Sequence, residues 1–173
     1  MTALIIGGAR SGKSRYAQGW AERGGAAVAL IATGQARDAE MAARIARHQA
    51  ERPAAWQTVE EPIHLAAVLQ RAAGAGRCVV VDCLTLWVLN LLEAGESVFV
   101  EERAALLALV PQLAGEVIFV SNEVGLGVIP MGSLSRRFVD EAGWLNQDLA
   151  AIVDTVVFVA AGLPLVMKGV VDV

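Results

Sequence analysis

The sequence contains little cysteine. Cys78 and Cys83 are its two cysteines, and a zinc site built from cysteine pairs would need a second pair. Nothing in the sequence indicates the secretory context in which disulfides are common. We therefore expect both cysteines to be small buried residues of a reduced, cytoplasmic protein.

Long hydrophobic runs and clustered positive charge are also missing. No stretch reaches the roughly 18 uninterrupted apolar residues that a membrane-spanning helix needs. The apolar segment Ala3–Ile6 ends at glycines and is too short for the hydrophobic part of a signal peptide. The formal net charge is −4 and no basic run exceeds two residues. We expect neither a transmembrane segment nor a nucleic-acid partner.

The residues that are present suit a globular α/β domain. Apolar residues make up 55% of the 173 residues, which fits one domain over residues 1–173 with a sizeable core. Continuous apolar runs that alternate with helical patterns are typical of parallel strands buried on both faces. The expected strands are Ala3–Ile6, Ala27–Ala32, Gln57–Val59, Cys78–Val81, Val117–Val120, Thr155–Ala160 and an antiparallel edge strand, Leu165–Lys168.

Helical periodicity accounts for most of the remaining chain. Asp38 is the expected N-cap of the second helix and Ser133 that of the last. The fourth helix, Leu84–Leu92, is apolar nearly all round, so it must be covered on both sides and is a candidate subunit interface. The expected helices are Lys13–Arg23, Ala39–Ala50, Ile63–Ala73, Leu84–Leu92, Glu101–Leu109 and Leu134–Ile152.

A phosphate-binding loop follows the first expected strand. The eight residues match G-x-x-x-x-G-K-[ST] in full, between a strand and a helix. Its amides can surround a phosphate, Lys13 can reach the β- and γ-phosphates, and the Ser14 hydroxyl can ligate Mg²⁺. Lys13 is one of only two lysines, with Lys168. The loop residues are Gly7, Gly8, Ala9, Arg10, Ser11, Gly12, Lys13 and Ser14.

This loop predicts a P-loop NTPase fold of RecA-like type, with a mostly parallel sheet flanked by helices. A second Mg²⁺ ligand is expected at the end of another buried strand, and Asp82 directly follows Val79–Val81. The alternative is that Asp82 only caps the next helix.

Histidine is the other rare residue type, with His48 and His64 alone. His48 lies in the expected helix Ala39–Ala50, where a nearby Arg44 favours a neutral imidazole, which is a competent nucleophile toward phosphorus. From spacing alone, a surface histidine without a function is the favoured interpretation of His48, and it is favoured more strongly for His64.

Blocks of residues along nearly the whole chain resemble one enzyme family. They are GGARSGKS at 7–14, Ile31–Thr33, Met41–His48, Arg52–Pro53 with Trp56, NEVGLGVIP at 122–130, Arg137–Phe138 to Asn146–Gln147, and Gly162–Leu165. The family is the bifunctional adenosylcobinamide kinase/adenosylcobinamide-phosphate guanylyltransferase of cobalamin synthesis.

The resemblance implies two reactions. ATP or GTP phosphorylates the hydroxyl of the aminopropanol arm of adenosylcobinamide. A histidine, His48 here, then takes GMP from GTP and passes it to adenosylcobinamide phosphate, which gives adenosylcobinamide-GDP. Some relatives carry two adjacent histidines at this place, whereas this chain has Arg47–His48.

The resemblance also implies Mg²⁺, a homotrimer and further nucleotide contacts. Asp82 is Glu in some relatives, so its role as metal ligand or as contact to the base stays open. The implied contacts are Thr33, Gly34, Gln35, Glu51, Arg52, Pro53, Ala54, Glu60, Glu61 and Asp82.

Two other functions remain open at the level of sequence. One is a P-loop kinase for another small alcohol or nucleoside, in which His48 would be idle. The other is a nucleotide-switched ATPase or GTPase module. A covalently retained GMP would separate the first interpretation from both.

Overall fold

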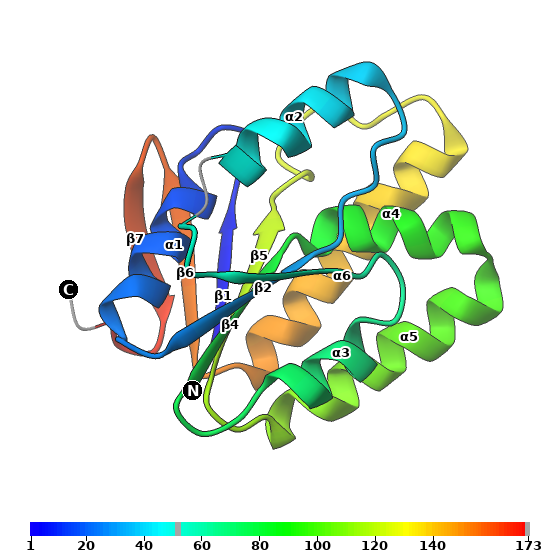
Figure 1. Cartoon of the computed structure of the whole chain (residues 1–173). Helices are drawn as coiled ribbons and strands as arrows, with labels where there is room; N and C mark the ends of the chain where they lie inside the picture. Colours follow the sequence, from blue (N-terminus) through cyan, green and yellow to red (C-terminus); the bar gives the residue numbers. More distant parts are fainter. Residues whose placement is uncertain (51–52, 172–173) are drawn as a thin grey trace.

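The computed structural model describes residues 1–50 and 53–171, apart from the side chains of Arg44 and His48. Its centre is a seven-stranded sheet in the order β3-β2-β4-β5-β1-β6-β7 (Figure 1). All neighbouring pairs are parallel except β6 and β7, which are antiparallel. This confirms the predicted α/β class with an antiparallel edge strand. The strands are Thr2–Gly7 (β1), Ala27–Ala32 (β2), Gln57–Glu60 (β3), Arg77–Asp82 (β4), Glu116–Asn122 (β5), Thr155–Ala160 (β6) and Leu163–Lys168 (β7).

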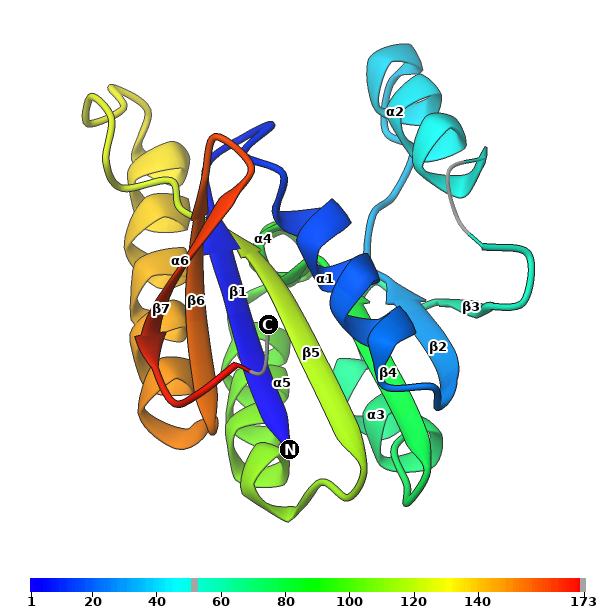
Figure 2. The ribbon, with the colours of Figure 1, turned by 90° about the vertical axis from the view of Figure 1, so that its left-hand side faces the viewer.

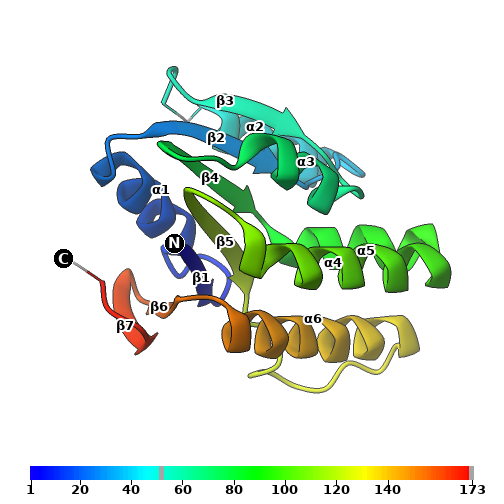
Figure 3. The same cartoon turned by 90° about the horizontal axis from the view of Figure 1, so that it is seen from below.

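Helices cover both faces of the sheet (Figures 2 and 3). One face carries α1, and the other packs against α3 to α6, where the larger apolar cluster includes Trp87, Phe119 and Leu145. β1, β4 and β5 form the centre of the sheet and are buried over most of their length, as their continuous apolar runs predict. The helices are Lys13–Arg23 (α1), Ala39–Ala50 (α2), Leu65–Ala72 (α3), Leu84–Ala94 (α4), Glu96–Leu109 (α5) and Ser133–Ile152 (α6), with a short 3₁₀ turn at Val110–Gln112.

The apolar helix α4 is covered by its own chain. Leu84, Trp87 and Leu91 are fully buried, and α4 packs between β5, α5 and α6. Trp87 also donates its indole N–H to the Ile63 carbonyl oxygen at 2.7 Å. The apolar surface of α4 is thus explained by burial within the subunit, and it no longer indicates a subunit interface.

Three helix starts test the sequence predictions. The Asp38 cap is confirmed, because its carboxylate accepts a hydrogen bond from the Met41 amide at 2.7 Å. The Ser133 cap is wrong: Ser133 is already helical and Gly132 precedes it without a side-chain cap. Helix α5 begins at Glu96 rather than Glu101, since Gly95 at φ 116° makes the turn from α4 in a single residue.

Both cysteines are free and buried, as predicted. Burial and then the neighbouring Glu116 carboxylate raise the pKa of Cys78 to about 12. Burial and then Asp82 raise the pKa of Cys83 to about 11. The thiolates are therefore disfavoured at neutral pH, and neither cysteine is a reactive nucleophile. Within the described residues no helix is long and apolar enough to span a membrane.

His64 at the start of α3 makes stability depend weakly on pH. Its hydrogen bond to Glu102, 2.7 Å from Nδ1 to Oε1, and the charge of that carboxylate raise the pKa of His64. The pair therefore stabilises the fold fully below pH ~6.5, and this contribution disappears as the pH rises through the higher folded pKa. Because His64 is exposed, we expect less than about 1 kcal/mol.

The measurement compares the free energy of unfolding of the wild type and His64→Gln by urea titration. The difference between them should be larger at pH 5.5 than at pH 9, and Glu102→Gln should show the same trend. A larger difference at pH 9 would contradict this assignment.

Candidate nucleotide-binding site

The loop after β1 has the backbone geometry of an anion-binding nest. Gly12 has φ +96° directly before α1, and Arg10 has φ +58°. A Cβ on Gly12 would lie 3.1 Å from the Gly162 Cα, and the Gly162 amide donates to the Ser11 carbonyl oxygen at 2.8 Å. The β6–β7 turn thus braces the loop, so its amides are held in place before a phosphate arrives.

A cleft of about 970 Å³ opens beside this loop, between α1 and α2. That volume suits a nucleotide-sized ligand. Four cationic side chains line the described part of the cleft against three carboxylates, in a protein whose net charge is −4. The cations are Arg10, Lys13, Arg15 and Arg47, and the carboxylates are Glu22, Glu40 and Asp82. The described lining thus has one more cation than carboxylates, whereas the chain as a whole is negative, and this favours a polyphosphate.

Six of the loop residues, Ala9 to Ser14, line the cleft together with Asp82. Gly7 and Gly8 start the loop, and a Cβ on Gly7 would lie 2.4 Å from the Val159 carbonyl oxygen, so only glycine fits there. The Lys13 ammonium donates to the Gly8 carbonyl oxygen at 3.2 Å, which holds it along the loop. The structure brings the predicted loop and the predicted acid to one place.

Mg²⁺ fits the polar groups that meet in this cleft. Ser14 offers a hydroxyl and Asp82 a carboxylate, both oxygen ligands, and Mg²⁺ commonly takes only one or two protein ligands beside phosphate and water. The described residues contain no cluster of three or more His, Cys, Asp or Glu side chains that could enclose a metal alone. A cation there would depend on a bound nucleotide for its remaining ligands.

Thr33, expected to contact the nucleotide, lies fully buried after β2. Its hydroxyl donates to the Cys83 carbonyl oxygen at 2.7 Å and accepts from the Cys83 amide at 3.1 Å. Its own carbonyl oxygen accepts from Asn90 Nδ2 at 2.8 Å. Thr33 therefore joins the carboxyl ends of β2 and β4 and positions the backbone next to Asp82.

Replacing Thr33 by Val should lower the free energy of unfolding by about 1–3 kcal/mol, because both backbone groups of Cys83 would lose a buried partner. The midpoint of urea unfolding measures this. Thr58→Val on the exposed strand β3 is the matched control and should change stability by less than about 0.5 kcal/mol. Equal effects of the two substitutions would refute the role of the Thr33 hydroxyl.

The other predicted contacts do not line the described cleft. Gly34 lies against Leu86 and Ile45, where an added Cβ would be 3.3 Å and 3.6 Å away. The Glu61 carboxylate accepts hydrogen bonds from the backbone amides of Ile63 and His64. The Glu60 carboxylate accepts a hydrogen bond from the side-chain amide of Gln49. Gln35, Pro53 and Ala54 are also not among the residues that line the cleft, and Glu51 and Arg52 lie outside the described residues.

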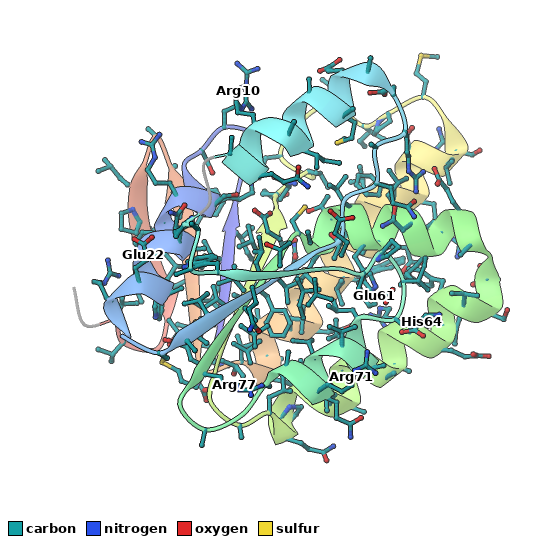
Figure 4. The ribbon with its side chains drawn as sticks, in the orientation of Figure 1. Arg10, Glu22, Glu61, His64, Arg71 and Arg77 are labelled. Carbon is teal, nitrogen blue, oxygen red and sulfur yellow. The ribbon has the colours of Figure 1, made fainter. Side chains whose placement is uncertain are left out.

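The two histidines have different surroundings. The backbone of His48 is in α2, and its side chain is outside the described part of the chain. Three residues of the same helix, Glu40, Ala43 and Arg47, line the cleft. His64 instead pairs with Glu102 on α5, away from Arg10 and Glu22 at the cleft (Figure 4). The interpretation of His64 as a surface residue agrees with this position.

Sequence reasoning missed several residues that line the cleft. Gln18 and Glu22 follow Ser14 at intervals of four on α1, and Glu40, Ala43 and Arg47 recur at helical spacing on α2. The register of α1, counted onward from the phosphate loop, would have identified the first two.

The chain is similar to known proteins along nearly its whole length. The family described as "Cobinamide kinase / cobinamide phosphate guanyltransferase" matches residues 3–167. The bifunctional adenosylcobalamin biosynthesis protein CobP of Pseudomonas aeruginosa is 56% identical over 170 residues, which cover 98% of each chain. The protein CobU of Escherichia coli is 37% identical, with 97% of this chain and all of the relative covered.

A solved structure from Pyrococcus horikoshii OT3 has the same fold, with a TM-score of 0.56. It covers 99% of this chain and 87% of its own, and at 10% identity it supports the fold alone.

Proposed function

The chain belongs to the cobinamide kinase / cobinamide phosphate guanyltransferase family, and from that premise we propose how its residues carry out the two reactions. The protein is a kinase and nucleotidyltransferase that uses nucleotide substrates. The observation that carries the proposal is the meeting of Lys13, Ser14 and Asp82 in one cleft, beside the helix that contains His48.

The kinase reaction uses the phosphate loop. The hydroxyl oxygen of adenosylcobinamide attacks the γ-phosphorus of ATP or GTP, the bond to the bridging oxygen breaks, and the nucleoside diphosphate leaves. Such transfers depend mainly on positioning and on neutralising charge, which the loop amides and Lys13 supply. Ser14 and Asp82 would hold Mg²⁺, which neutralises phosphate charge when bound.

The transferase reaction uses His48. An imidazole nitrogen attacks the α-phosphorus of GTP, the bond to the bridging oxygen breaks, and pyrophosphate leaves. A phosphate oxygen of adenosylcobinamide phosphate then attacks the same phosphorus and breaks the P–N bond, which gives adenosylcobinamide-GDP and restores the neutral histidine. Imidazole suits this role because it makes a labile P–N bond.

The contact surface for the corrinoid is proposed to be the segment 123–133 after β5. It begins beside the phosphate loop, where the Glu123 amide donates to the Gly7 carbonyl oxygen at 3.0 Å. Its side chains Leu126, Val128, Ile129 and Met131 are 77–96% exposed. The apolar side chains of helix α4 are mostly buried and offer no comparable surface. The resemblance further implies a homotrimer, which light scattering coupled to gel filtration would test. The free, buried cysteines fit a reduced, cytoplasmic protein.

The kinase proposal is tested with γ-labelled ATP and, separately, γ-labelled GTP. Label should pass to adenosylcobinamide, and release of label should depend on the corrinoid. Release of inorganic phosphate at the same rate without the corrinoid would contradict the proposal and favour a nucleotide-switched module. Transfer of label to another small alcohol alone would favour a different kinase.

A further inference from the structure

Asn122 is the last residue of β5, the strand that lies between the phosphate-loop strand β1 and the Asp82 strand β4. It is paired in register with Gly7, the first residue of the loop. Asp82 pairs with Val120 on the other side of the same strand. Asn122 therefore sits at the carboxyl edge of the sheet between the two predicted groups that hold phosphate and Mg²⁺, where parallel α/β sheets bind ligands.

Its surroundings fix the side chain near the charged groups of the site. The Asn122 amide N–H donates to the Thr85 hydroxyl at 2.6 Å, and its Nδ2 lies 3.9 Å from the Cys83 sulfur. Cys83 directly follows Asp82, the last residue of β4. The carboxamide of Asn122 thus lies beside the end of β4, and its backbone lies beside the first residue of the phosphate loop.

The two ends of this carboxamide differ. Asn122 is half-buried, yet its Oδ1 is buried and has no hydrogen-bond partner among the described residues. Leaving such an acceptor unpaired destabilises the fold, so a hydrogen-bonding role in the fold does not explain an asparagine here. Its NH₂ group has two donors, and the contact to sulfur at 3.9 Å occupies one of them weakly.

We propose that Asn122 is a further catalytic residue of the kinase reaction, whose NH₂ group donates a hydrogen bond to the γ-phosphoryl group under transfer. The bond from the acceptor oxygen to the γ-phosphorus forms as the bond to the leaving diphosphate breaks. The hydroxyl proton passes to a phosphoryl oxygen and then to solvent, because a carboxamide is not basic. Asn122 stabilises only the charge on the phosphoryl oxygens.

This inference rests on the proposed function, and its test uses both reactions of the full-length protein. Asn122→Leu keeps the number and branching of the side-chain heavy atoms and removes the donor. The control is Asn146→Leu, because Asn146 also has a buried, unpartnered Oδ1 but lies within α6 and not at the carboxyl end of a strand. Single-turnover phosphorylation of adenosylcobinamide, retention of GMP from α-labelled GTP, and thermal unfolding are measured for both variants and the wild type.

Asn122→Leu should slow phosphorylation about 10²-fold or more at saturating nucleotide, as loss of one transition-state donor does. Its KM for the nucleotide should change less than about threefold, its GMP labelling should persist, and its melting temperature should not fall. Asn146→Leu should phosphorylate at the wild-type rate.

Two results would overturn the inference. One is phosphorylation by Asn122→Leu within about threefold of wild type. The other is an equal loss of phosphorylation and GMP labelling, which would mean a structural role for the whole site. A wild type that does not phosphorylate adenosylcobinamide would refute the proposed function itself, and the inference with it.

Discussion

His48→Asn should abolish guanylyl transfer, with a loss of at least about 10³-fold, while phosphorylation of adenosylcobinamide continues. Asparagine keeps a polar side chain of similar size but has no nitrogen that can attack phosphorus. The phosphate loop, Lys13 and Asp82, which the kinase reaction uses, lie on other elements. Rates of the two reactions are measured separately, with α-labelled GTP for transfer and γ-labelled nucleotide for phosphorylation.

The chain offers a matched control in its only other histidine. His64→Asn removes an exposed imidazole that pairs with Glu102, so both reactions should proceed at wild-type rates. Guanylyl transfer by His48→Asn at the wild-type rate would contradict the covalent role of His48. Loss of transfer in both variants would point to a general effect on the fold.

Lys13→Met should slow phosphoryl transfer by about 10²–10³-fold. Methionine keeps much of the length of the side chain but removes the ammonium group that neutralises the β- and γ-phosphates. The structure holds this ammonium within the loop, 3.2 Å from the Gly8 carbonyl oxygen. The rate at saturating nucleotide and corrinoid is the decisive measurement, because a change in affinity alone would leave it unaltered.

The only other lysine is again the control. Lys168 donates to the carbonyl oxygens of Ala150, Ala151 and Val153 at 2.6–3.0 Å and so caps the end of α6. Lys168→Met should keep the rate and lower stability by about 1–3 kcal/mol. Lys13→Met with an unchanged rate, or Lys168→Met with the larger loss of rate, would contradict the assignment.

The strands were the most predictable part of the fold. Val79–Val81 and Val117–Val120 are short continuous apolar runs rich in β-branched residues, which is typical of strands buried on both faces. Helix boundaries depended on contacts that a local pattern does not contain. Gly95 turns the chain in one residue, so α5 starts five residues early, and Glu61 holds the amides of Ile63 and His64 outside α3.

In the site, too, features set by contiguous residues were predictable from the sequence, and features set by distant contacts were not. The phosphate loop is contiguous, so its motif alone predicted where Lys13 and Ser14 would lie. The environment of Thr33 was not predictable, because its two partners belong to Cys83, fifty residues away. The apolar character of α4 suggested an exposed interface, and only the packing of α5 and α6 around it shows that it is core. The position of Asn122 between the phosphate loop and Asp82 likewise follows only from the order of the strands in the sheet.

The most direct test of the central claim is whether the protein forms a covalent guanylyl-histidine that the corrinoid can accept. Wild-type protein is incubated with Mg²⁺ and α-labelled GTP, and one portion is denatured while another is first mixed with adenosylcobinamide phosphate. The account predicts label that stays on the denatured protein, survives alkali but not acid, and moves to the corrinoid in the second portion. Catalytically active protein that retains no label would contradict it and leave a simple P-loop kinase.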